Sequence, residues 1–123
     1  MKILMVDDSK TMLRIEKNVL QKLGLNAEIV EAYDGEDGWE KYQQDKYDLI
    51  MVDWNMPKMT GIELVKKIRA VDKETKIVMV TSESEKSHII EAIKAGVNQY
   101  IVKPFDENTM KRKLQELKIL PPD

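Results

Sequence analysis

The sequence has no cysteine among its 123 residues and only one histidine, His88. The absence of cysteine excludes disulfides, catalysis by a thiolate and zinc sites built from cysteine. A single histidine leaves little scope for a histidine-rich metal site. No acid or base stands near His88 at the spacing of a catalytic triad, so we expect it to be a solvated residue on a helix.

The chain also lacks a long apolar run and an excess of charge of one sign. No stretch approaches the roughly 18 apolar residues of a membrane-spanning helix, and the N-terminal MKILMVDD has no signal-peptide cleavage site. We therefore expect a cytoplasmic protein that does not contact membranes. Twenty basic against twenty-two acidic residues give a net charge of −2, which does not support nucleic-acid binding through a broad basic field.

Five short apolar segments recur along the chain, and stretches with helical spacing separate them. Four of the segments are nearly continuous apolar runs, as is typical of strands that are covered on both faces. The remaining one, AEIVEA, alternates and is expected at an edge of the sheet. The segments are 3–6, 27–32, 49–52, 77–80 and 100–102. This pattern predicts an α/β fold, (βα)5, with a five-stranded parallel sheet and helices on both faces, formed by residues 1–123 as a single domain.

Several local signals predict where helices begin and which face they bury. Thr60 with Glu63 reads as a capping box, and Ser82 with Glu85 predicts another. Gly24 stands where the first helix should end. The apolar face of that helix is expected to consist of Met12, Ile15, Val19 and Leu23.

Polar residues directly follow four of the five apolar segments. They are Asp7 and Asp8, Asp53, Thr81 and Ser82, and Lys103. Ligands of open α/β sheets bind at the carboxyl ends of the strands, so these side chains are expected to converge there. Each of them alone is typical of a turn or a helix cap. However, structural needs do not require three carboxylates and one ammonium around one point.

The charge of this cluster predicts its chemistry. Three aspartates and one lysine sum to −2, and two carboxylates about 4 Å apart repel by roughly 4 kcal/mol at an effective dielectric of 20. Either a proton stays bound or a divalent cation occupies the gap, and oxygen ligands favour Mg²⁺ over zinc. Bound Mg²⁺ leaves positions for phosphate oxygens. We therefore expect phosphoryl transfer, with Asp53 as the acceptor and with Lys103 and Thr81 holding phosphoryl oxygens.

Four segments, VDDS, VDWNMPKMTG, MVTSE and YIVKPF, resemble in order and spacing the receiver domain of two-component response regulators, in particular those of chemotaxis. The likeness covers the whole chain. It implies a flavodoxin-like strand order, 2-1-3-4-5, and a monomeric receiver with no effector domain. It also implies a signalling protein and not a conventional enzyme, because a receiver catalyses only its own phosphorylation and dephosphorylation.

The resemblance implies a role for each matching acidic position. Asp53 would accept the phosphoryl group from a phosphohistidine on a chemotaxis-type histidine kinase. Asp8 and Asp53 would bind Mg²⁺ directly, together with the backbone carbonyl of Asn55, and Asp7 would act through water. Glu83 would influence dephosphorylation, with or without a separate phosphatase.

The resemblance also implies how the signal leaves the site. Thr81 and Lys103 would contact the phosphoryl group, and the peptide between Lys103 and Pro104 is often cis in this family. Phosphorylation would draw Thr81 inward, and Tyr100, the switch aromatic, would turn into the vacated space. The partner surface, which we expect to contact the flagellar motor switch, would include Lys86, Ile89, Tyr100 and Lys113.

Other functions remain open at this point. A Mg²⁺-dependent phosphohydrolase with an aspartate nucleophile usually carries a second aspartate two residues later, where this chain has Asn55. A flavodoxin-like electron carrier would need a hydroxyl-rich loop after the first strand to hold the flavin phosphate, and none is present. A receiver that serves as a phosphate sink for the kinase, and not as a motor regulator, is a further alternative.

Overall fold

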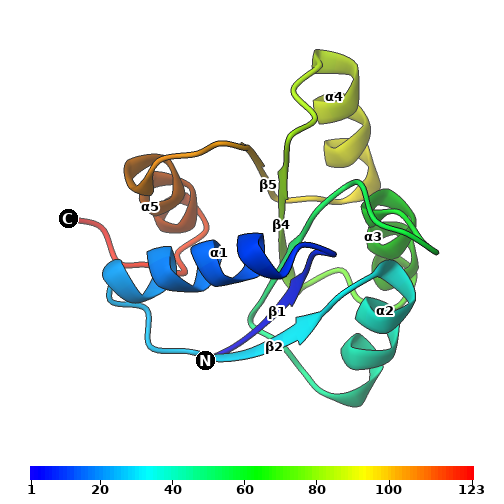
Figure 1. The fold of residues 1–123 in the computed structure, drawn as a ribbon, viewed down its shortest axis with the longest axis horizontal. Helices are drawn as coiled ribbons and strands as arrows, with labels where there is room; N and C mark the ends of the chain where they lie inside the picture. The colour runs from blue at the N-terminus through cyan, green and yellow to red at the C-terminus, as the bar shows by residue number, and fades with distance from the viewer.

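The computed structural model describes residues 1–123, along which strands and helices alternate strictly (Figure 1). The elements are β1 (Lys2–Val6), α1 (Lys10–Lys22), β2 (Glu28–Ala32), α2 (Gly35–Gln44), β3 (Leu49–Val52), α3 (Gly61–Val71), β4 (Lys76–Thr81), α4 (Lys86–Ala95), β5 (Gln99–Val102) and α5 (Glu107–Glu116). None of these helices combines the length and the apolar composition that crossing a membrane would need.

The five strands form one parallel sheet in the order β2-β1-β3-β4-β5. The helices α1 and α5 cover one face, and α2, α3 and α4 cover the other (Figure 1). The expected fold and strand order are confirmed, and so is the edge position of the alternating strand β2. Because β2 has a neighbour on one side only, its side chains can be partly polar.

The central strand β3 explains why a continuous apolar run leads to a carboxylate. All four of its side chains are buried, and they alternate between the two faces of the sheet. Leu49 and Met51 pack in the cluster under α1 and α5, whereas Ile50 and Val52 pack in the cluster under α2, α3 and α4. The next residue, Asp53, therefore leaves the core at the middle of the carboxyl edge of the sheet.

Most of the predicted helix signals are confirmed. Thr60 and Glu63 form both hydrogen bonds of a capping box at the start of α3, and Gly24 follows α1 with a φ of 80°. The prediction of a second capping box, formed by Ser82 and Glu85, is wrong. Helix α4 begins only at Lys86, with no side-chain cap, because residues 82–85 form a loop whose backbone bonds to Thr81 and Tyr100.

The predicted apolar face of α1 is only partly correct, since Val19 and Leu23 pack against the core but Ile15 does not. The helix buries Leu13, Glu16 and Leu20, whereas Ile15 is 43% exposed. Apolar residues cover more of the surface of α1 than the sheet can bury. The helix is rotated so that Leu13 and Leu20 face the core, and this rotation places Glu16 between them.

Candidate functional site

The carboxyl edge of the sheet brings together the polar residues that the sequence singled out. The Lys103 Nζ donates hydrogen bonds to Asp7 Oδ2 at 2.8 Å and to Asp53 Oδ2 at 3.0 Å. Lys103 lies 96 residues from Asp7 and 50 from Asp53 in the chain, and only 12% of the side chain of Lys103 is exposed. The predicted convergence of carboxylates and an ammonium is confirmed.

Three carboxylates of this site, those of Asp7, Asp8 and Asp53, form what we call the acidic triad. One oxygen of each lies within 4.8 Å of the others. Mg²⁺ bonds oxygen at about 2.1 Å, which places its ligand atoms roughly 3–4 Å apart, so a small closure of the acidic triad would suit this ion. The donor set is all oxygen, as a hard cation requires. The residues present therefore fit Mg²⁺.

The charges in the site depend on one another. Burial raises the pKa of Asp7, although the hydrogen bonds from Lys103 and from the backbone of Ser9 act in the opposite direction. Burial also opposes the charged form of Lys103, but its ion pairs with Asp7 and Asp53 outweigh this effect and raise the pKa of Lys103. The ammonium is thus firmly protonated at neutral pH and partly compensates the acidic triad.

The backbone around Asp53 holds its carboxylate in place. The Asp53 N–H donates to Val6 O on β1 at 3.1 Å, and Gly61 N donates to Trp54 O at 2.8 Å, which closes the loop between β3 and α3. A Cβ atom on Gly61 would lie 2.0 Å from the backbone oxygen of Asp53. Only glycine therefore allows the start of α3 to approach the candidate acceptor so closely.

The expected switch residues lie beside this site. Thr81, at the end of β4, is fully buried, and its Oγ1 accepts a hydrogen bond from Glu83 N at 3.4 Å. Tyr100 is 8% exposed and donates its hydroxyl to Glu83 O at 2.6 Å. Burial, with a smaller effect from Glu83 and Asp53, raises the pKa of Tyr100 to about 12. The loop after β4 thus connects both residues, and Tyr100 already points inward in this structure.

The predicted partner surface surrounds β5, the edge strand opposite β2. Helices α4 and α5 contact β5 from the two faces of the sheet. Lys86 is exposed, Ile89 and Lys113 are half-buried, and Tyr100 is buried. Sequence reasoning missed Ile90 and Ile93, which are exposed on α4, although the apolar run around them was a signal for an uncovered helix face.

Two further residues near the site were not anticipated. His88 is half-buried, and its ring packs edge-on against Trp54 with 4.8 Å between the ring centroids. His88 lies on a helix as expected, but its side chain is only 32% exposed, so it is partly and not fully solvated. Glu16 is only 3% exposed, and its Oε2 has no hydrogen-bond partner. Burial raises the pKa of Glu16 to about 8, with Lys103 opposing this shift and Asp7 adding to it.

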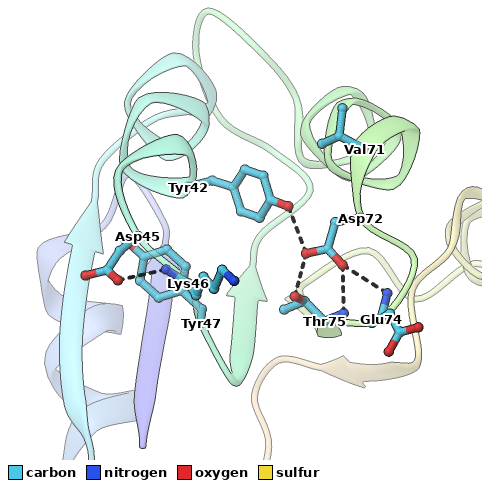
Figure 2. Close-up of a pocket in the computed structure, with 8 residues that line it drawn as sticks. All are labelled: Tyr42, Asp45, Lys46, Tyr47, Val71, Asp72, Glu74 and Thr75. Atoms are coloured by element: carbon cyan, nitrogen blue, oxygen red, sulfur yellow. Dashed lines mark hydrogen bonds between the residues drawn. The ribbon is translucent and has the colours of Figure 1, made fainter.

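A separate hollow of about 420 Å³ lies at the opposite edge of the sheet, where the strands begin (Figure 2). Asp72, which ends α3, accepts hydrogen bonds there from the side chain of Tyr42 at 2.8 Å and from Thr75 and Glu74. Burial opposes ionisation, but these bonds outweigh it and lower the pKa of Asp72. Every oxygen of this carboxylate is used to join α3 to β4, so we interpret the network as structural.

Comparison with known proteins agrees with this geometry. Residues 3–115 match the response regulator receiver domain. The chain is 49% identical to chemotaxis protein CheY1 of Helicobacter pylori over 118 residues, which cover 94% of each protein. It is 48% identical to a chemotaxis protein CheY homolog of Campylobacter jejuni over 120 residues, which cover 95% of this chain and 92% of that one.

Solved structures show the same fold. Chemotaxis response regulator CheY4 of Vibrio cholerae superimposes with a TM-score of 0.84 at 36% identity, covering 94% of this chain and 97% of that one. A CheY-like receiver domain protein from Methanospirillum hungatei also gives 0.84, at 28% identity, over 94% and 91% of the two chains. The protein therefore belongs to the response regulator receiver domain family and is closely related to the CheY chemotaxis regulators.

Proposed function

We propose that this protein is a stand-alone, monomeric response regulator of the cytoplasm that accepts a phosphoryl group on Asp53 from the phosphohistidine of a chemotaxis-type histidine kinase. The observation that supports this best is the environment of the Asp53 carboxylate. It lies within the acidic triad and 3.0 Å from the Lys103 ammonium. A nucleophilic carboxylate, a cation site and a fixed ammonium are the groups that phosphoryl transfer needs.

The chain's own residues would carry out the transfer as follows. An Asp53 carboxylate oxygen attacks phosphorus in line, a P–O bond forms, and the P–N bond to the kinase imidazole breaks. The imidazole leaves with the electron pair. Lys103 exchanges its bond to Asp53 for a phosphoryl oxygen, and the Thr81 hydroxyl donates to another.

The charge of the product explains why a metal is needed. Asp8, Asp53 and the backbone carbonyl of Asn55 would hold Mg²⁺, with Asp7 acting through water, and the bound ion would neutralise charge between the acceptor and the phosphoryl group. The phosphoryl group brings a charge of about −2. Together with the charges of Asp7, Asp8 and Lys103, the net charge of the phosphorylated site would be about −3 without the metal and about −1 with it.

The output would come from an equilibrium that the phosphoryl group biases. Thr81 and Tyr100 are both buried here, and the loop at Glu83 connects them. A phosphoryl oxygen that accepts the Thr81 hydroxyl would favour this inward arrangement of Tyr100. The surface of α4, β5 and α5, including Lys86, Ile89 and Lys113, would then bind the flagellar motor switch.

Intact mass measured after incubation with acetyl phosphate and Mg²⁺ tests the acceptor. We expect a gain of one phosphoryl group for the wild type, no gain with EDTA, and no gain for Asp53→Asn, which keeps the shape of the side chain. Asp48→Asn is a matched control, because Asp48 lies at the opposite end of β3. Labelling that persists in Asp53→Asn would refute the assignment.

The main competitor is a Mg²⁺-dependent phosphohydrolase, and turnover separates the two. We expect no sustained release of phosphate from small phosphate esters. Binding of the phosphorylated form, and not of the unphosphorylated form, to a motor-switch peptide would support motor control. Equal binding of both forms would contradict it and would favour a phosphate sink.

A further inference from the structure

Four side chains form a cluster at the opening of the candidate site, which we call the mouth cluster. They are Trp54, Asn55, Glu83 and His88. The Asn55 side-chain amide donates to Glu83 Oε1 at 2.8 Å. The other carboxylate oxygen of Glu83, Oε2, lies 3.6 Å from His88 Nδ1, a buried nitrogen that has no hydrogen-bond partner. The contact between Glu83 Oε2 and His88 Nδ1 is therefore the one polar contact of the mouth cluster that falls short of a hydrogen bond.

The mouth cluster connects two functional segments of the chain. Trp54 and Asn55 directly follow the acceptor Asp53, and Glu83 stands two residues after Thr81. His88 lies in the first turn of α4, the helix of the partner surface. Its ring meets Trp54 at an interplanar angle of 84°, an edge-to-face arrangement that aromatic rings favour. This contact directs Nδ1 towards Glu83.

We propose that His88 is a positioning residue for hydrolysis of the phosphoryl group on Asp53, because it holds Glu83, and through it Asn55, where they orient the attacking water. This inference depends on the proposed function. In the step itself the water oxygen bonds to phosphorus and the P–O bond to Asp53 breaks. The Asp53 carboxylate leaves with the electron pair, the water loses a proton to solvent, and inorganic phosphate departs.

The geometry supports this role for three reasons. The side chains of Glu83 and His88 are 31% and 32% exposed, so water reaches the mouth cluster. The pair of Asn55 and Glu83 retains an amide N–H and a carboxylate oxygen that can bind this water. Finally, the distance of 3.6 Å from His88 to Glu83 is just beyond a hydrogen bond, and such contacts often tighten only when the reacting group is present.

Two substitutions separate the two features of His88. His88→Phe keeps an aromatic ring on Trp54 but removes both nitrogens, whereas His88→Gln keeps an N–H donor and removes the ring. Each protein is phosphorylated with acetyl phosphate and Mg²⁺, the donor is removed, and the loss of the phosphoryl group is followed by mass. The rate of phosphorylation and the thermal unfolding temperature are measured separately.

We expect His88→Phe to lose its phosphoryl group roughly three- to tenfold more slowly than the wild type, since small displacements of orienting groups have effects of this order or larger. Phosphorylation should stay within about twofold of the wild-type rate, because the residues that assist it do not touch His88. His88→Gln should retain most of the wild-type hydrolysis rate.

The controls test the path through Glu83. Glu85→Gln removes the other carboxylate near His88 Nδ1, at 3.9 Å, but its side chain is 76% exposed, so hydrolysis should be unchanged. In a Glu83→Gln background, His88→Phe should have little further effect, because residues in one network are not additive.

Several results would overturn the inference. One is wild-type hydrolysis in a labelled and stable His88→Phe protein. Another is an equal change in both rates, which would show a structural role. A third is hydrolysis that is as slow in His88→Gln as in His88→Phe, which would show that a retained N–H donor is not what supports the rate. Failure to label even the wild type would instead refute the proposed function itself.

Discussion

The buried carboxyl group of Glu16 leads to a quantitative prediction about stability. The pKa of Glu16 is about 8 in the folded protein against 4.5 for the ordinary side chain, mainly because burial disfavours its charged form. Between these two values the folded chain retains a proton that the unfolded chain releases. A raised pKa of an acid therefore contributes stability that is fully present below pH 4.5 and is lost as the pH rises through 8.

The size of the effect follows from the same two values. Each pH unit between them changes the free energy of unfolding by about 1.4 kcal/mol. From pH 5 to pH 8 the contribution of Glu16 should thus fall by about 4 kcal/mol. Glu16→Gln has nearly the same shape and does not titrate. From pH 5 to pH 8 we expect the free energy of unfolding of this variant to rise by about 4 kcal/mol relative to that of the wild type. This difference is a large part of the stability of a typical domain.

Urea unfolding at pH 5, 6, 7 and 8 in the presence of EDTA measures this difference. The groups that face Glu16, namely Lys103, Asp7 and Asp53, are common to both proteins, so most of their own titration cancels. Glu40→Gln, on the exposed side of α2, is the matched control and should show no such trend. Parallel pH profiles for wild type and Glu16→Gln would refute the reasoning.

Three other changes have expected outcomes. Gly61→Ala should reduce the free energy of unfolding by roughly 2–4 kcal/mol in urea denaturation, because its Cβ would collide with the backbone of Asp53; a neutral result would contradict the close approach. Asp8→Asn should weaken Mg²⁺ binding at least about tenfold in a tryptophan fluorescence titration, since it removes a charged ligand; unchanged affinity would exclude Asp8 from the metal site. Tyr100→Ala should abolish the gain in motor-switch peptide affinity on phosphorylation, and a retained gain would refute the switch.

Much of the fold could be predicted because its signals are local. The continuous apolar runs marked strands that are covered on both faces, and the capping box at Thr60 marked the start of α3. Asp53 could be placed at the carboxyl edge because it follows a strand whose four residues are all buried. Strand direction alone then brought Asp7, Asp8 and Lys103 to the same edge.

Other features depended on contacts between distant parts of the chain. Nothing near Glu16 in the sequence indicated that α1 would turn this residue towards the core, because two overlapping apolar stripes were available. The contact of His88 with Trp54 joins residues 34 positions apart, and no periodicity encodes it.

The sequence by itself determined the alternation of strands and helices, the parallel sheet, and the chemical groups gathered at its carboxyl edge. These features follow from hydrophobic periodicity and turn chemistry, which act between residues a few positions apart. Only the tertiary structure decided the rotation of α1, the burial of Glu16 and the assembly of the mouth cluster. Those outcomes depend on how whole helices pack against the sheet, where many side chains compete for the same buried space.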